Sequence, residues 1–80
     1  MSTQIKMIWD FRGESAKKIA EHHAIHLNEF ITNEDIKDAF VGTEIVSPMY
    51  AIAFLVVDET LMNPLREKLK PHRGQKYLKQ

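Results

Sequence analysis

The 80-residue sequence predicts an α+β fold, a ferredoxin-like two-layer sandwich with the element order β-α-β-β-α(-β). Three observations predict it. Residues 4–12 alternate between apolar and polar side chains, residues 16–31 repeat apolar side chains at helical spacing, and residues 49–57 are almost wholly apolar. In such a fold both helices cover one face of an antiparallel sheet. The globular composition, 44% hydrophobic and 28% charged, indicates a single domain over residues 1–80.

A half-buried strand is expected over residues 4–12. Its alternation has the period of two that places successive side chains on opposite faces of a sheet. The first face carries the apolar side chains of Ile5, Met7, Trp9 and Phe11. The second face carries the side chains of Lys6, Ile8, Asp10 and Arg12.

An amphipathic helix is expected from about Ser15 to Asn33. Ser15 is the expected N-cap, because its hydroxyl can accept a hydrogen bond from a first-turn N–H. One stripe of this helix collects the side chains of Ala16, Ile19, Ala20, His23, Leu27, Phe30 and Ile31. The small alanine side chains would allow the helix to approach a sheet closely.

Two further strands are expected to follow as a hairpin. The polar residues 33–39 predict a loop, and residues 40–46 predict a weak strand in which Gly42 could form a bulge. Pro48 predicts the turn, since proline fixes φ and donates no backbone hydrogen bond. Residues 49–57 then predict a central strand, because the run is short and rich in β-branched side chains.

A second helix is expected to begin near Thr60, where leucines recur at helical spacing. Pro64 is compatible with its first turn, in which the missing N–H is not needed. Pro71 is expected to end it. Residues 70–80 form a basic C-terminal tail, and residues 75–78 within it could pair as a short edge strand.

The charges are unevenly distributed along the chain. Residues 1–63 hold five basic and ten acidic side chains, whereas residues 64–80 hold six basic and one acidic. This basic end suits an anion-binding or nucleic-acid-binding site, or it reflects cations gathered near a helix C-terminus. Nucleic acid is an unexpected partner, because residues 48–54 lack the basic residue and the glycine of the RNA-recognition string.

The composition excludes several kinds of chemistry. The absence of cysteine excludes disulfides, thiolate metal sites and cysteine nucleophiles. No apolar run reaches about 18 residues, so no membrane partner is expected. Residues 1–6 lack a charged-then-apolar leader, and a cytoplasmic location is therefore expected. The sequence has no glycine-rich phosphate-binding motif, and no cofactor is expected.

The strand at residues 49–57 is apolar on both faces, and this predicts a homodimer. Two helices can cover only one face of the sheet, so the apolar side chains of the open face would remain exposed in a lone chain. A second copy packed on the open sheet face would bury them. The alternatives are a small exposed patch or a longer tail that folds across this face.

Three histidines lie within five residues of the first helix and are candidate ligands. His22 and His26 are four residues apart and share a helical face with Glu29, so these three could hold zinc or iron. The ordinary interpretation is that His22 and His26 are surface residues. His23 lies in the apolar stripe and is expected to be a buried neutral imidazole with a hydrogen bond.

A second candidate ligand-binding group lies at the end of the first strand. Asp10 and Arg12 share a strand face beside Trp9, and they could pair or present a carboxylate and a guanidinium to a ligand. His72 and Arg73 occupy a turn in the C-terminal tail and are further candidate ligand-binding residues, which would approach the first strand only if the tail folds back. The ordinary interpretation of Asp10 and Arg12 is a surface ion pair.

Three functions remain open from the sequence. The expected one is a non-catalytic homodimeric module that binds a small molecule or a protein, since no catalytic motif is present. The second is a small metal-binding protein or enzyme that uses His22, His23 and His26. The third is an anion or nucleic-acid binder that uses the basic C-terminus.

Overall fold

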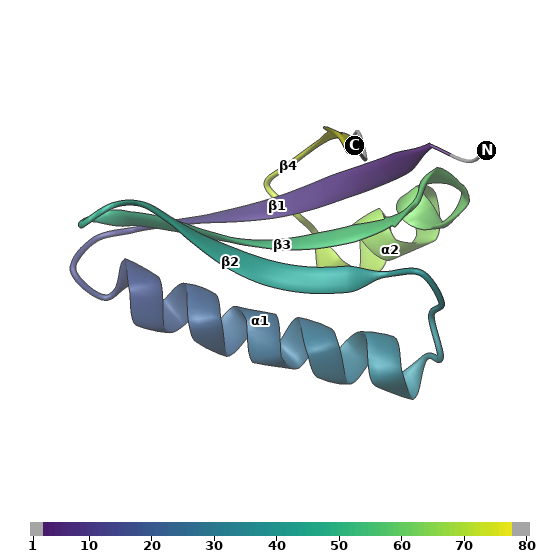
Figure 1. Cartoon of the computed structure of the whole chain (residues 1–80), viewed down its shortest axis with the longest axis horizontal. Coiled ribbons are helices and arrows are strands. Elements are labelled where there is room, and N and C mark those ends of the chain that lie inside the picture. The colour runs from purple at the N-terminus through teal and green to yellow at the C-terminus, as the bar shows by residue number, and fades with distance from the viewer. Residues whose placement is uncertain (1–2, 78–80) are drawn as a thin grey trace.

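The structure is a computed structural model of the chain and describes residues 3–77. Its four strands are β1 (Gln4–Arg12), β2 (Phe40–Ser47), β3 (Tyr50–Asp58) and β4 (Arg73–Tyr77). Its two α-helices are α1 (Ala16–Asn33) and α2 (Met62–Leu69), and a 3₁₀ turn over Glu59–Leu61 precedes α2 (Figure 1). The predicted α+β class is therefore confirmed.

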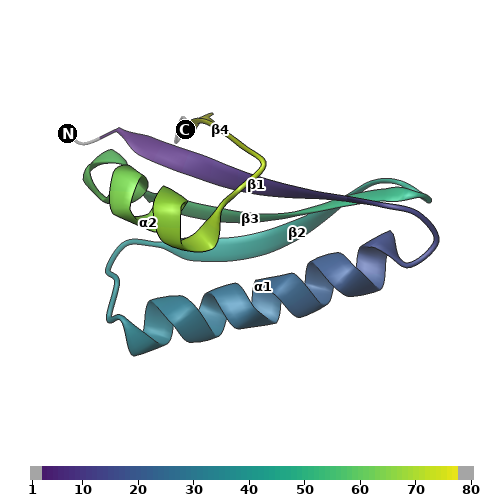
Figure 2. The same cartoon turned by 180° about the vertical axis from the view of Figure 1, so that it is seen from behind.

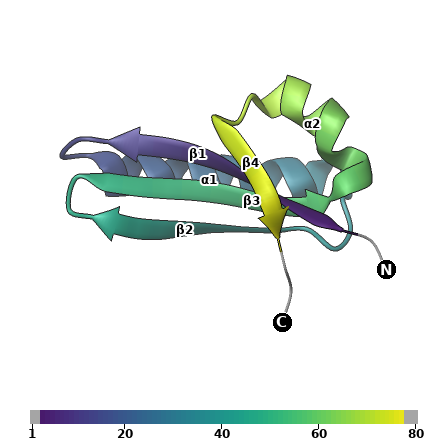
Figure 3. The ribbon, with the colours of Figure 1, turned by 90° about the horizontal axis from the view of Figure 1, so that it is seen from above.

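The strands form one antiparallel sheet in the order β2-β3-β1-β4. β1 and β3 pair along their whole length at the centre of the sheet. β4 pairs only with the first part of β1, from Gln4 to Ile8, and crosses the other strands at a steep angle (Figure 3). The edge strand suggested within residues 75–78 thus begins earlier, at Arg73, and Leu78 lies outside the described residues.

Both helices contribute to one hydrophobic core on the same face of the sheet. α1 lies along this face (Figures 1 and 2), and α2 contributes Leu65. The buried residues of α1 are Ala16, Ala20, Ala24 and Leu27. The strands contribute Ile5, Met7, Trp9, Ala51, Ala53, Leu55 and Val57. Within residues 3–77, neither helix is long and apolar enough to cross a bilayer.

Gly13 turns the chain from β1 into α1. Its φ is +115°, a conformation that side chains with a Cβ rarely adopt. Its N–H donates to the carbonyl of Met49 at 2.8 Å, and its own carbonyl accepts from the N–H of Ala16 at 3.1 Å. Ser15 occupies the N-cap position, but the expected hydrogen bond from its side chain is absent. The backbone of Gly13 supplies a first-turn acceptor instead.

The bulge suggested at Gly42 is not present at that position. The pairing of β2 with β3 places Gly42 opposite Phe54, and the irregularity lies between Ile45 and Ser47. A Cβ on Gly42 would lie 2.5 Å from Cζ of Phe54. The glycine lets the aromatic ring lie against the backbone, and a side chain here would displace this ring; the strand does not bulge at this point.

The helix-free face of the sheet is largely covered by the chain itself. Ile8, Ile52 and Val56 point to this face, yet their exposed fractions are 2%, 4% and 0%. The face also carries the ring of Phe54, on which the ammonium of Lys6 lies 4.4 Å from the centroid. Long basic side chains can cover apolar surface in this way while their charge remains in water.

Candidate functional site

Asp10 lies at the centre of a polar cluster on the helix-free face. Its carboxylate accepts hydrogen bonds from the Tyr50 hydroxyl and, at 3.1 Å each, from Nε and Nη2 of Arg73. The two Arg73 bonds form a bidentate pair, which is the strongest geometry for a guanidinium and a carboxylate. The Arg73 and Tyr50 bonds, in that order, hold the pKa of Asp10 below its usual value.

His72 attaches the start of β4 to β1 through two hydrogen bonds. Its backbone N–H donates to the carbonyl of Ile8 at 3.0 Å, and its Nδ1 accepts from the backbone N–H of Asp10 at 2.8 Å. Because Nδ1 accepts, the ring is the neutral tautomer with its proton on Nε2. Nδ1 of His72 lies 3.9 Å from Oδ2 of Asp10, which is too far for a hydrogen bond.

Arg12 takes a different position from the one the sequence suggested. It shares a strand face with Asp10, as predicted, but Asp10 pairs with Arg73 instead. The Arg12 guanidinium lies 4.0 Å from the centroid of the Tyr50 ring, a cation–π contact. Three predicted candidates, Asp10, Arg12 and Arg73, thus contact the Tyr50 side chain, which the sequence did not single out. His72 instead bonds to the backbone of Asp10, and its ring lies beside Phe11, with centroids 6.3 Å apart.

Trp9 lies on the core side and has a structural contact. Its Nε1 donates to the carbonyl of Leu69 at 3.2 Å, at the end of α2.

The His23 ring packs against Trp9, with ring centroids 4.9 Å apart, and against Phe11 at 5.6 Å. His23 was expected to be buried with a hydrogen bond, but the residue is only partly buried, and its buried Nε2 has no hydrogen-bond partner in the described part of the chain. Burial, followed by neighbouring histidines, lowers the pKa of His23.

His22 and His26 lie away from this cluster, on the exposed side of α1. Their Nε2 atoms are 3.0 Å apart, and Nδ1 of His26 lies 3.3 Å from Oε1 of Glu29. Among residues 3–77, no group of three or more His, Asp or Glu side chains is arranged to hold a metal ion. His26 thus contacts His22 through one ring nitrogen and Glu29 through the other, so Glu29 does not approach the point between the two Nε2 atoms.

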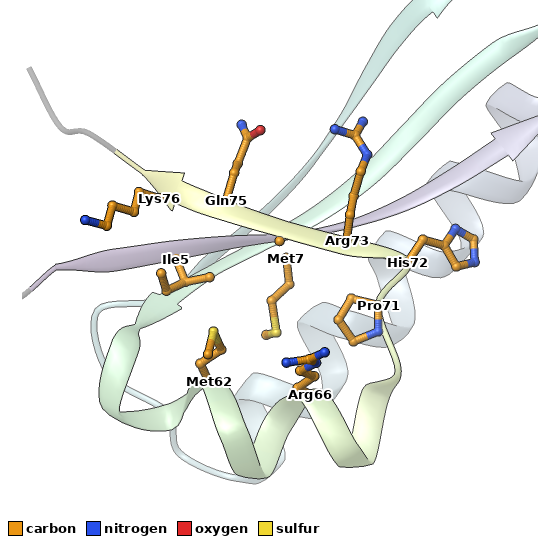
Figure 4. A pocket seen from close by; sticks show the side chains of 10 residues that line it. Ile5, Met7, Met62, Arg66, Pro71, His72, Arg73, Gln75 and Lys76 are labelled. Atoms are coloured by element: carbon orange, nitrogen blue, oxygen red, sulfur yellow. The ribbon is translucent and has the colours of Figure 1, made fainter.

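A cleft of about 390 Å³ opens between α2, β1 and β4, and we name it the α2–β4 cleft. It is lined by Ile5, Met7, Met62, Arg66, Pro71, His72, Arg73, Gly74, Gln75 and Lys76. Figure 4 shows Met7 and Met62 pointing into the space between β1 and α2, whereas Arg73 and Gln75 point away from it. Gly74 lies opposite Met7, so the strand above the cleft has no side chain at that point.

The chemical character of the cleft is apolar and cationic. The described residues of its lining include no carboxylate, while Arg66 and Lys76 each contribute a cation. No ion pair joins either of these two side chains to an acid within residues 3–77. Neither Arg66 nor Met62 was predicted as a binding residue from the sequence. The excess of basic residues in 64–80 pointed toward Arg66, and no sequence signal pointed to a binding role for Met62.

Comparison with protein families, with curated proteins and with solved structures finds no match for this chain.

Proposed function

We propose that this protein is a non-catalytic binding module for a small amphipathic anion, and that the α2–β4 cleft is its binding site. The observation that carries the proposal is a cleft with an apolar floor and two cations, in which residues 3–77 supply neither an acidic lining residue nor an ion-pair partner for these cations. Its volume of about 390 Å³ is in the lower part of the range of small-molecule sites. Such sites are mostly apolar, with a few polar groups that orient the ligand.

The lining favours a carboxylate attached to a short hydrocarbon body. Met7 and Met62 offer flexible, polarisable side chains that adapt to an apolar shape. Arg66 can bind a carboxylate through two parallel N–H bonds, and Lys76 adds a second positive charge at the strand. Asp10 does not compete for these cations, because its carboxylate already pairs with Arg73 on the opposite face of the sheet.

The binding of octanoate tests this function. We expect octanoate to bind more tightly than 1-octanol, which lacks the charge, and more tightly than acetate, which lacks the hydrocarbon body. Arg66→Gln should weaken octanoate binding by roughly tenfold or more, because charge-assisted hydrogen bonds contribute about 1.5–3 kcal/mol. Isothermal calorimetry on the full chain measures all three affinities.

Two substitutions on one strand provide the control. A Cβ at Gly74 would lie 3.8 Å from its nearest atom, so we expect the fold to accept Gly74→Val. The methyl groups of the valine would then fill the cleft. Gln75→Val places the same side chain on the opposite side of β4 (Figure 4). We expect the Gly74 variant to lose octanoate binding and the Gln75 variant to keep it. Equal binding by both variants, or no preference for octanoate over octanol, would refute the proposal.

We also propose that the fold is the ferredoxin-like sandwich. The chain order β1, α1, β2, β3, α2, β4 and the antiparallel sheet support this assignment. The shared core of the two helices on one face supports it as well. This fold hosts many unrelated functions, so the assignment adds nothing to the choice of ligand. Backbone NOEs between β1 and β3 and between β1 and β4 provide the test by NMR.

We further propose that a second copy of the chain associates at the β2 side of the helix-free face. Phe40 and Val46 of β2 are 41% and 51% exposed, and Met49 in the following turn is 51% exposed. β2 is also an edge strand with one unpaired side, which can extend a sheet in another copy. The mass in solution, measured by light scattering, distinguishes one chain from two.

A further inference from the structure

We propose that His22 and His26 form a two-imidazole site for a divalent transition-metal ion, Cu²⁺ in preference to Ni²⁺ and Zn²⁺, and that Glu29 orients His26 without binding the ion. The site lies on the exposed side of α1, and none of its residues lines the α2–β4 cleft. The inference is therefore independent of the proposed anion-binding function.

The two imidazoles converge through the same ring atom. The Nε2 atoms are 3.0 Å apart, and the rings meet edge to face at 83° with centroids 4.5 Å apart. Because the residues are separated by four positions on one helix, the backbone of α1 holds both rings on the same face. Without a metal, one proton occupies the space between the two nitrogens. A divalent ion replaces this proton, which moves to the solvent-exposed Nδ1 of His22.

The distance between the nitrogens favours a particular metal. If the two nitrogens keep their 3.0 Å separation when the ion binds, metal–nitrogen bonds of about 2.0–2.1 Å give an N–metal–N angle of about 95°. This angle is closer to the right angle of a tetragonal site than to a tetrahedral one. Tetragonal nitrogen and oxygen coordination is typical of Cu²⁺ and Ni²⁺, and Cu²⁺ binds such ligands most tightly of the common divalent ions. Water would fill the remaining positions.

Glu29 acts on the site through His26. Its Oε1 lies 3.3 Å from Nδ1, the ring nitrogen that faces away from His22. A carboxylate there favours a proton on Nδ1, which leaves the lone pair of Nε2 free for the metal. This role differs from the one suggested by the sequence, in which Glu29 was a third ligand. His23 takes no part, because its ring packs against Trp9 and Phe11.

Titration of the tag-free chain with CuCl₂ near neutral pH, followed by calorimetry, tests the site. We expect one ion per chain and tighter binding of Cu²⁺ than of Zn²⁺. His22→Ala and His26→Ala should each weaken binding by roughly 100-fold or more, because a lone imidazole loses the effective concentration of its neighbour. Glu29→Gln should weaken it by about tenfold, as for other residues that orient a metal ligand. The electron paramagnetic resonance spectrum should show two coordinated nitrogens.

A spacing control keeps the number of histidines constant. The double variant Lys18→His with His22→Ala has histidines at positions 18 and 26, which are eight residues apart and too far to share one ion. Removal of the positive charge of Lys18 would not by itself weaken the binding of a cation. We expect the double variant to bind as weakly as His22→Ala. Equal Cu²⁺ affinity in this control and the wild type, or a spectrum with one nitrogen, would overturn the site. A loss in Glu29→Gln as large as in the histidine variants would overturn the orienting role.

Discussion

Asp10 is the residue that joins three strands. It lies on β1, accepts a hydrogen bond from Tyr50 on β3, and pairs with Arg73 on β4. β4 is short and pairs with only part of β1. The hydrogen bonds of this cluster therefore help to fix Arg73, the first residue of β4, against β1. Asp10 is also largely shielded, with a side chain that is 19% exposed. Its interactions therefore contribute more than those of an exposed surface pair.

Asp10→Asn should destabilise the protein. The substitution keeps the shape of the side chain but removes the charge that Arg73 and Tyr50 bond to. We expect the free energy of unfolding to fall by about 1–3 kcal/mol. Urea denaturation at neutral pH measures the change, with Asp35→Asn as the control, because the Asp35 side chain is 81% exposed and should contribute little.

The difference in stability between the wild type and Asp10→Asn should depend on pH. The pKa of Asp10 in the folded protein lies below that of an ordinary aspartate, so its ionised form stabilises the fold. This contribution is complete above the unfolded pKa and is lost as the pH falls through the lower, folded pKa. The stability advantage of the wild type over Asp10→Asn should therefore stay constant between neutral pH and about pH 5 and shrink below about pH 4. An advantage that persists unchanged to about pH 2 would contradict the assigned pairing.

At the scale of the element, small side chains set the distance of α1 from the sheet. Ala16 and Ala20 are 1% and 0% exposed, and Ala20 belongs to the core formed with β1 and β3. Ala20→Leu should lower the free energy of unfolding by about 1–3 kcal/mol, because added volume has no space in this core. Thermal unfolding measures it, and Lys17→Leu on the exposed face is the control. Similar losses in both variants would mean that helix propensity, not packing, limits stability.

The helices and strands were largely predictable because each carries its own periodic pattern. The helix expected after Ser15 and the strand at residues 4–12 match α1 and β1 at their ends. The central strand expected at residues 49–57 is shifted by one residue, to Tyr50–Asp58. The bulge predicted at Gly42 was wrong, because the reason for a glycine at this position is the Phe54 ring of the neighbouring strand. A pattern within one strand contains no information about that contact.

The candidate site was predictable only in part, since it depends on where β4 lies. The sequence named Asp10, His72 and Arg73, and β4 brings them together. It could not join Asp10 to Arg73, because the pairing requires the register between β1 and β4. The α2–β4 cleft was missed for the same reason. Its lining comes from segments at both ends of the chain, and their approach follows from tertiary packing.

At the scale of the whole molecule, the chain partly covers the sheet face that two helices leave open. Ile8, Ile52 and Val56 are buried there without a partner chain. Tyr77 at the end of β4 packs on Phe40 at the far side of the sheet, with ring centroids 5.5 Å apart. The apolar surface that remains for a partner is therefore smaller than the sequence suggested, and it lies toward β2.

This distribution predicts which substitutions alter self-association. If two copies meet at β2, Val46→Lys and Met49→Lys should convert a two-chain mass into a one-chain mass, because each places a charge in a buried apolar contact. Ile25→Lys is the matched control, since Ile25 is similarly exposed, at 56%, but lies on α1. Light scattering after gel filtration measures the masses, and circular dichroism verifies the folds. A one-chain mass for the wild type at the highest soluble concentration would contradict the dimer. A two-chain mass that only Ile25→Lys disrupts would instead place the interface on α1.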